Sequence, residues 1–133
     1  NGERLVDLWG GHADGAHQRP WTADTLANVW STTKGAMAAT IARLVSEGVL
    51  DYGAPVARYW PAFGAAGKEH ITVAELFSHQ AGLVGPEIQL TVDALYDVDA
   101  VADLLATQAP QWPLGSRSGY HAISIGYLAE GLV

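Results

Sequence analysis

The chain of 133 residues has the length of one domain, and its composition excludes several classes of protein. Hydrophobic residues make up 49% of it and five residues are tryptophan, which is enough for a substantial core and excludes a disordered chain. Seven basic and fourteen acidic residues give a formal net charge of −7, which argues against a nucleic-acid partner because phosphate binding needs clustered Lys and Arg.

The sequence contains no cysteine, so disulfides and thiolate metal sites are excluded and the redox compartment stays open. No apolar run approaches the roughly 20 residues of a membrane span, so we expect no membrane-spanning segment. The chain starts at Asn1 with neither an initiator methionine nor a signal-peptide core, and its localisation stays open. We predict no cofactor and no bound metal, and the oligomeric state is undetermined.

The first predicted element is a strand. Arg4 to Trp9 is a short β-branched and apolar run closed by Gly10 and Gly11, so residues 4–10 are typical of a β-strand. No second run of comparable quality follows. Because one strand cannot satisfy its own backbone hydrogen bonds, we expect its partners outside these 133 residues or in another chain. This pattern, together with an uncapped helical stripe at the C-terminus, predicts a piece of a larger protein.

A helix is predicted to begin near Ser31 and to end before Gly48, which stands where a C-terminal cap is expected. Its apolar stripe consists of Met37, Ile41, Leu44 and Val45. Side chains three positions apart are neighbours on a helix, about 5–6 Å apart at Cβ, whereas on a strand they point to opposite faces. Ser31 and Lys34 are therefore expected on one helical face, near its first turn.

The Ser31 and Lys34 pair is the first candidate for chemistry. A serine hydroxyl is a poor nucleophile until a base takes its proton, and a lysine is such a base only where apolar neighbours disfavour its ammonium form. Val29, Ala36 and Met37 are neighbours of that kind. The alternative is that a serine and a lysine stand three apart by chance on a solvated turn, so the motif alone does not decide.

Between this helix and the C-terminus the pattern is mainly helical. Residues 50–63, rich in Gly, Pro and aromatic side chains, are expected to form a loop. Thr72 and Glu75 form a capping box, which predicts a short helix that reaches about Ser78. Pro110 terminates the next predicted helix, which is amphipathic. Its apolar positions are Val98, Val101, Leu104 and Leu105. Those of the last predicted helix are Ile123, Tyr127, Leu128 and Leu132.

Tyr120 is the third candidate, and it stands where the last helix is expected to begin. A tyrosine in such a place usually serves in half-buried packing. The alternative is a phenol that passes a proton between Ser31, Lys34 and a leaving group, helped by a nearby ammonium. Spacing cannot decide between them, because Tyr120 lies 120 minus 34, or 86, residues from Lys34.

Four blocks of the sequence, in the same order, resemble the serine β-lactamase and penicillin-binding-protein superfamily. They are Ser31-Thr32-Thr33-Lys34 after Thr25 to Trp30, Leu44 to Asp51, Leu76 to Leu83, and Trp112 to Gly115 leading to Tyr120. Within the superfamily the chain is most similar to the class C β-lactamase-like branch that includes the family VIII esterases. The similarity spans nearly all 133 residues.

The resemblance implies an α+β parent fold, in which an antiparallel sheet is joined to a helical domain. Residues 1–133 would then be a single partial domain, mostly α-helical, with the strand at 4–10 belonging to the central sheet. The helix of the Ser-x-x-Lys motif and the helix at Tyr120 would form one wall of the active-site cleft, and the remaining strands would lie outside this chain.

The resemblance also implies a serine hydrolase that acts through an acyl-enzyme. Ser31 would be the acylated nucleophile, Lys34 its proton acceptor, and Tyr120 the partner in general acid/base transfer. The substrate would be a small-molecule carboxylic ester, with a β-lactam or a D-Ala-D-Ala peptide as alternatives. β-Lactamases of this branch carry an asparagine two residues after the tyrosine, whereas this chain has Ala122, whose side chain offers no hydrogen bond. That departure favours an ester.

A later family element, a short Lys, His or Trp motif on a strand facing the nucleophile, is absent from these 133 residues. The resemblance implies that this strand also supplies one amide of the oxyanion hole, the other being the Ser31 amide. We therefore expect the chain to be inactive when isolated.

Three other interpretations were weighed. An α/β-type hydrolase would place its serine in G-x-S-x-G, a context that no serine here has. His12, Asp14 and His17 could be zinc ligands by type, but a Gly-rich solvated loop is the favoured interpretation. A relative that binds or is acylated without turnover, such as a peptidoglycan sensor, stays open.

Two further histidines fall close to the candidate residues. His79 and His121 are expected to pack or hydrogen-bond near helix ends, with a functional role for His121 beside Tyr120 as the alternative.

Overall fold

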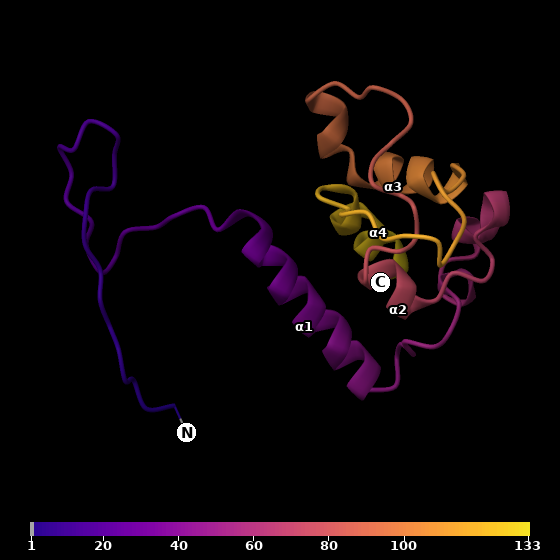
Figure 1. Cartoon of the computed structure of the whole chain (residues 1–133), viewed down its shortest axis with the longest axis horizontal. Helices are drawn as coiled ribbons and strands as arrows, with labels where there is room; N and C mark the ends of the chain where they lie inside the picture. The colour runs from indigo at the N-terminus through magenta and orange to yellow at the C-terminus, as the bar shows by residue number, and fades with distance from the viewer. Residues whose placement is uncertain (1) are drawn as a thin grey trace. The chain divides into compact units, whose positions relative to one another are not determined.

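The computed structural model of the chain describes residues 2–133 and divides into two compact units. The first ends at Trp30, and the second spans Ser31–Val133. All regular elements in the described residues are helical, and Figure 1 labels the four α-helices. The second unit contains nearly all of them, together with every candidate residue for chemistry.

The predicted strand is not seen. Residues 3–10 carry no regular structure, and the side chains of Leu5, Val6 and Leu8 are 84%, 73% and 88% exposed. A strand exists only through hydrogen bonds to a neighbour, and no described residue supplies such a ladder to this segment. Across residues 2–133, the β-pairing consists of two isolated antiparallel bridges, His12 with Pro20 and Pro55 with Thr72.

The first unit is organised by a loop that closes on itself. The Ala13 amide donates to the Arg19 carbonyl at 2.8 Å, and the Trp21 amide donates to the Gly11 carbonyl at 2.9 Å. Both carboxylate oxygens of Asp14 are engaged within the loop. Asp14 therefore acts as an acceptor for backbone amides here.

The helix predicted after Ser31 is confirmed. Helix α1 spans Thr33–Ser46 and follows the 3-10 turn η1, Trp30–Thr32. It ends where expected, because Gly48 adopts a φ of 75° and the Val49 amide donates back to the Leu44 carbonyl at 2.9 Å. Ser31 itself belongs to the 3-10 turn and precedes Thr33, the first residue of α1, by two positions.

The segment predicted as a loop contains two short 3-10 helices, η2 (Val56–Arg58) and η3 (Pro61–Gly67). The capping box then starts α2, Val73–Phe77, as predicted. The Glu75 amide donates to the Thr72 hydroxyl at 3.2 Å, and the Thr72 amide donates to the Glu75 carboxylate at 2.8 Å.

Three further helices complete the chain: η4 (Asp93–Tyr96), α3 (Val98–Thr107) and α4 (Ser124–Leu132). The amphipathic helix predicted before Pro110 is confirmed as α3. The last predicted helix starts later than expected, because Ile123 precedes α4 and is 66% exposed, while Ile125 is buried in its place. Tyr120 therefore lies in the loop before α4 and not on a helix.

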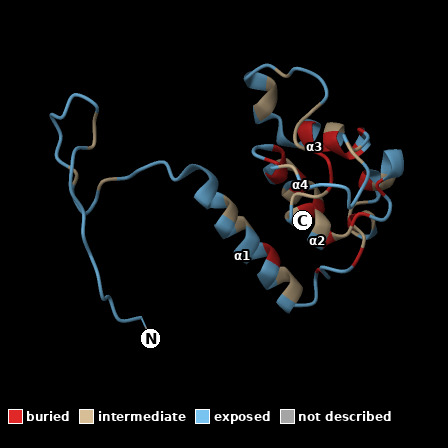
Figure 2. Ribbon diagram, in the orientation of Figure 1, coloured by how far each residue is buried: buried red, intermediate tan, exposed pale blue. Residues whose placement is uncertain are grey.

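The core belongs to the second unit, and Figure 2 shows its buried residues gathered on α2, α3 and α4. Only Ile41 of α1 is fully inside it, while Met37, Leu44 and Val45 pack against it from the same face of that helix. The predicted stripe of α1 thus faces the core. The large, fully buried apolar residues of the core are Ile41, Val56, Phe63, Ile71, Val73, Leu76, Leu83, Leu105, Ile125 and Leu128.

One charged side chain lies inside this core. Lys68 is fully buried, and its ammonium group donates to the carbonyls of Ala65, at 2.8 Å, and Gln108. Burial lowers the pKa of Lys68 below its ordinary value. Since Gln108 is the C-terminal cap of α3, Lys68 ties the η3 segment to the end of that helix.

Candidate active site

The first two predicted site residues lie together at the start of α1. Lys34 stands in the first turn of the helix, and its Nζ donates to Ser31 Oγ at 3.1 Å. The spacing of three residues brings the two groups onto one face, as the sequence predicted, because the 3-10 turn η1 runs directly into α1.

The third predicted residue reaches the same point from the other end of the chain. The Tyr120 hydroxyl donates to Ser31 Oγ at 2.7 Å, across 89 positions of sequence. Lys34 Nζ also lies 5.0 Å from the centre of the Tyr120 ring, within the range of a cation–π contact. Ser31 Oγ therefore has the amine on one side and the phenol on the other.

The surroundings of Tyr120 favour the loss of its proton. Its hydrogen bond to Ser31 and then the nearby Lys34 ammonium lower the pKa of Tyr120 below its ordinary value, against a small opposing effect of desolvation. Within these residues, Tyr120 is 54% exposed and Ser31 is exposed as well.

Lys34 has a second partner that the sequence did not reveal. Its Nζ donates to the main-chain carbonyl of Ala122 at 2.6 Å. The side chain of Ala122 itself offers no hydrogen bond. Because the acceptor is a backbone oxygen, no residue type could have signalled it.

The loop that carries Tyr120 and Ala122 is fixed to the segment after α2. The Gly119 amide donates to the His79 carbonyl at 3.0 Å, and the His121 amide donates to His79 Nδ1 at 3.2 Å. His79 adopts a φ of 63°, in the left-handed region that non-glycine residues rarely visit. The prediction that His79 and His121 make hydrogen bonds near helix ends is thus confirmed.

A close contact with a tryptophan ring fixes the same loop at Gly119. A Cβ added to Gly119 would lie 2.9 Å from Cζ2 of Trp112, closer than real Cβ atoms come to other atoms, and 3.1 Å from Cγ1 of Val84, which is a tight contact. The residue before Tyr120 must therefore be a glycine for the Trp112 ring to occupy this position.

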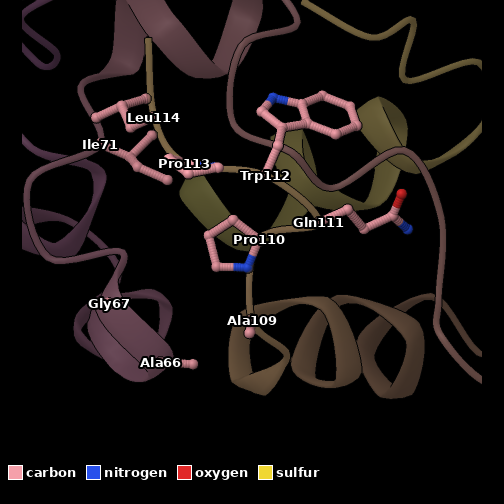
Figure 3. A pocket seen from close by; sticks show the side chains of 9 residues that line it. All are labelled: Ala66, Gly67, Ile71, Ala109, Pro110, Gln111, Trp112, Pro113 and Leu114. Atoms are coloured by element: carbon pink, nitrogen blue, oxygen red, sulfur yellow. The ribbon is translucent and has the colours of Figure 1, made fainter. Parts of the chain in front are cut away.

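A cavity of about 430 Å³ lies on a different part of the second unit, and Figure 3 shows its lining. The lining residues come from the end of η3, from Ile71 and from the segment Ala109–Leu114. None of the three predicted site residues lines this cavity. Ser31, Lys34 and Tyr120 therefore lie together outside this cavity.

The structure gives no support to the metal interpretation. Within residues 2–133, no three His, Cys, Asp or Glu side chains are grouped so that they could hold a metal ion. The rings of His12 and His17 stack on each other, 4.7 Å between centres, while Asp14 binds the backbone of its own loop. Over the same residues, no helix is both long and apolar enough to cross a membrane.

Comparison with known proteins identifies a family that the chain matches. The family model described as Beta-lactamase matches residues 1–133. The chain is 46% identical over 132 residues to the Esterase/beta-lactamase LipL of Mycobacterium tuberculosis (strain ATCC 25618 / H37Rv), a match that covers 99% of this chain.

Two solved structures are similar. A family VIII carboxylesterase superposes with a TM-score of 0.91 at 50% identity, over 96% of this chain and 35% of that one. A penicillin-binding protein homolog from Caulobacter crescentus gives 0.87 at 48% identity, over 92% of this chain and 33% of that one. The chain spans only about 30% of the length of LipL.

Proposed function

Because the chain belongs to the beta-lactamase family, we propose that it is the part of a longer serine hydrolase that carries the nucleophile and its proton-transfer partners. Relatives of the chain are named as esterases and as an esterase/beta-lactamase, which supports hydrolysis as the reaction class. The single observation that carries the proposal is the convergence of Lys34 Nζ and the Tyr120 hydroxyl on Ser31 Oγ, at 3.1 and 2.7 Å.

The reaction proposed is ester hydrolysis through an acyl-enzyme. Ser31 Oγ attacks the ester carbonyl carbon, its proton passes to the Lys34 and Tyr120 pair, and the pair returns a proton to the departing alkoxide. Water then attacks the carbonyl carbon of the acyl group. The Lys34 and Tyr120 pair takes a proton from this water and returns a proton to Ser31 Oγ, which releases the carboxylic acid and restores Ser31. The overall change is ester plus water to acid plus alcohol.

The resting hydrogen bonds suit this use. Both Lys34 Nζ and the Tyr120 hydroxyl donate to Ser31 Oγ, so the serine is activated once either partner gives up a proton. The lowered pKa of Tyr120 makes its phenolate more accessible than that of an ordinary tyrosine. A phenolate 2.7 Å from Oγ is within reach of the serine proton.

An ester is the proposed substrate class, and a β-lactam is the second candidate. Ala122 occupies the position where lactamases of the resembled branch carry an asparagine, which argues for an ester. A β-lactam is the second candidate because LipL is named as an esterase/beta-lactamase and one similar structure is a penicillin-binding protein homolog. Parallel assays with a p-nitrophenyl ester and with nitrocefin separate the two, and faster nitrocefin turnover would reverse the assignment.

A serine-reactive fluorophosphonate tests the nucleophile in the full-length protein. We expect one adduct, located on Ser31 by peptide mass spectrometry, and steady hydrolysis of a p-nitrophenyl ester. Ser31→Ala should lose both signals, whereas Ser46→Ala, at the other end of α1, should lose neither. An adduct without turnover would favour a sensor that is acylated and not regenerated, and no adduct would exclude the hydrolase.

A further inference from the structure

Each ring nitrogen of His121 makes a hydrogen bond to the backbone. Its Nε2 accepts the amide of Leu83 at 3.0 Å, and its Nδ1 lies 2.6 Å from the carbonyl of Gly119. A ring nitrogen that accepts an N–H carries no proton, so the ring proton is on Nδ1 and is donated to Gly119. Both bonds together require the neutral imidazole.

His79 completes the connection from the facing segment. Its Nδ1 accepts the backbone amide of His121 at 3.2 Å, and its carbonyl accepts the amide of Gly119 at 3.0 Å. The rings of His79 and His121 lie 5.3 Å apart, and the His79 ring meets the Tyr120 ring edge-on at 5.1 Å. We refer to these four hydrogen bonds of His79 and His121 as the histidine clamp.

The histidine clamp fixes the backbone on either side of Tyr120. Tyr120, whose hydroxyl reaches Ser31, stands between the two clamped residues Gly119 and His121. Ala122, whose carbonyl binds Lys34, follows directly. We propose that His79 and His121 are positioning residues that hold the Tyr120 hydroxyl and the Ala122 carbonyl in place for the reaction, an inference that rests on the proposed function.

The burial of His121 indicates a positioning role and not direct contact with the substrate. Its side chain is fully buried, so it cannot touch an ester that approaches the exposed Ser31. Neither ring nitrogen is free for substrate, because each one binds the backbone. Since displacement of a reacting group by about 1 Å costs on the order of 10²-fold in rate, a loosened clamp has a large effect without any lost contact to substrate.

The histidine clamp also predicts a dependence on pH. Protonation of His121 would place an N–H against the Leu83 amide, so the hydrogen bond that needs a neutral ring is lost. Burial holds the pKa of His121 below its ordinary value, against the raising effect of its hydrogen bond to Gly119 and with a further lowering effect of His79. Burial and the Lys34 ammonium lower the pKa of His79. Tyr120 and Lys34 are the titratable groups that face this pair. The clamp is therefore intact above pH 6.5 and is lost as pH falls through the lowered pKa.

The test uses the full-length protein with His121→Leu and His121→Gln, and with His70→Gln as the matched control on an exposed histidine. We expect His121→Leu to lower kcat for a p-nitrophenyl ester by about 10²-fold with little change in KM. His121→Gln keeps an amide oxygen for Leu83 and should recover part of that loss. It should also remove the acid limb of the kcat profile that His121 causes. Unchanged kcat and an unchanged pH profile in both variants would overturn the proposal.

A second measurement does not depend on activity. Titration of Tyr120, followed by NMR of ¹³Cζ-labelled tyrosine, should move toward the ordinary tyrosine value in His121→Leu because the phenol no longer sits against Ser31 and Lys34. In the unaltered protein, ¹⁵N NMR should place the His121 proton on Nδ1 at pH 7. A doubly protonated His121 ring at that pH, or an identical Tyr120 titration in the variant, contradicts the clamp.

The two proposals fail in different ways. Failure of Ser31 to react with the fluorophosphonate in the unaltered protein refutes the proposed function, while the NMR titrations still decide whether the histidine clamp holds Tyr120. Normal labelling of Ser31 together with unperturbed His121 variants refutes the clamp alone.

Discussion

Lys34 and Lys68 are held in similar ways at two places in the same unit, yet only one of them adjoins a group that can react. Each ammonium donates to a main-chain carbonyl from a distant part of the sequence, Lys34 to Ala122 and Lys68 to Gln108. The second partner differs. For Lys34 it is the hydroxyl of Ser31, and for Lys68 it is another carbonyl, that of Ala65.

The difference between the hydrogen-bond partners of the two lysines separates a structural environment from one that suits proton transfer. Two carbonyls around Lys68 satisfy a buried cation at the C-terminal end of α3, where the helix dipole also favours positive charge and where no basic residue of α3 stands in its last turn. Around Lys34, an exposed hydroxyl replaces one carbonyl and a phenol stands beside it. Carbonyls only hold the amine, whereas the hydroxyl and phenol can exchange protons with it.

The largest expected effect is on Lys34. Lys34→Ala should lower kcat/KM for a p-nitrophenyl ester on the order of 10⁴-fold or more, because residues that act as one catalytic unit lose most of their effect together. The full-length variant should keep its thermal unfolding midpoint within the range of an ordinary exposed substitution. Turnover at a normal rate would mean that Lys34 only holds the Ala122 carbonyl, as Lys68 holds its own acceptors.

Removing the phenol should have the next largest effect. Tyr120→Phe keeps the ring against His79 but removes the proton carrier, so kcat should fall by about 10²–10⁴-fold, the usual range for a general acid or base. The alkaline side of the kcat profile should change with it, since the lowered pKa of Tyr120 no longer contributes. A normal rate in this variant would make Tyr120 a packing residue.

Stability, and not activity, should respond at the structural lysine. Lys68→Met should lower the free energy of unfolding by about 1–3 kcal/mol, because the Gln108 and Ala65 carbonyls lose their donor inside the protein. Chemical denaturation measures this loss, and kcat of the folded fraction should be unchanged. A large fall in kcat at unchanged stability would show that the two lysines are not separated as described.

The smallest effect is expected for a cation at a helix end in solvent. Arg43 in the last turn of α1 binds Glu47 at 2.8 Å, but its side chain is 78% exposed. Arg43→Met is the matched control for Lys68→Met, and it should cost about 0.5 kcal/mol or less, falling further as salt is added. An equal loss in both variants would attribute the Lys68 effect to charge alone and not to burial.

Local patterns predicted most of the helical structure. The stripe of α1, the glycine at its end and the capping box of α2 act over a few residues, so each is visible in the sequence and each is present in the structure. The start of α4 was misplaced because Ile123 fits the apolar spacing although it remains exposed. The strand predicted at residues 4–10 is not seen, because a strand depends on a paired neighbour, and the described residues supply none.

The site was predictable only in part, for a related reason. Ser31 and Lys34 are three positions apart, so helix geometry alone brings them together. Spacing could not decide the role of Tyr120, which only the family resemblance implied, and its proximity needed the fold. The acceptor at Ala122 and the histidine clamp could not be predicted from residue types, because their key atoms are backbone amides and carbonyls. Such groups are present at almost every position, and only tertiary structure selects which of them meet.

The contact between Gly119 and the Trp112 ring limits how this surface can be redesigned. A library that varies position 119 alone should yield few members in which the Trp112 ring keeps its position, because every L side chain begins with the carbon that collides with the indole. Selection for altered substrates next to Tyr120 should therefore randomise positions 112 and 119 as a pair, so that a smaller residue at 112 makes room for a side chain at 119.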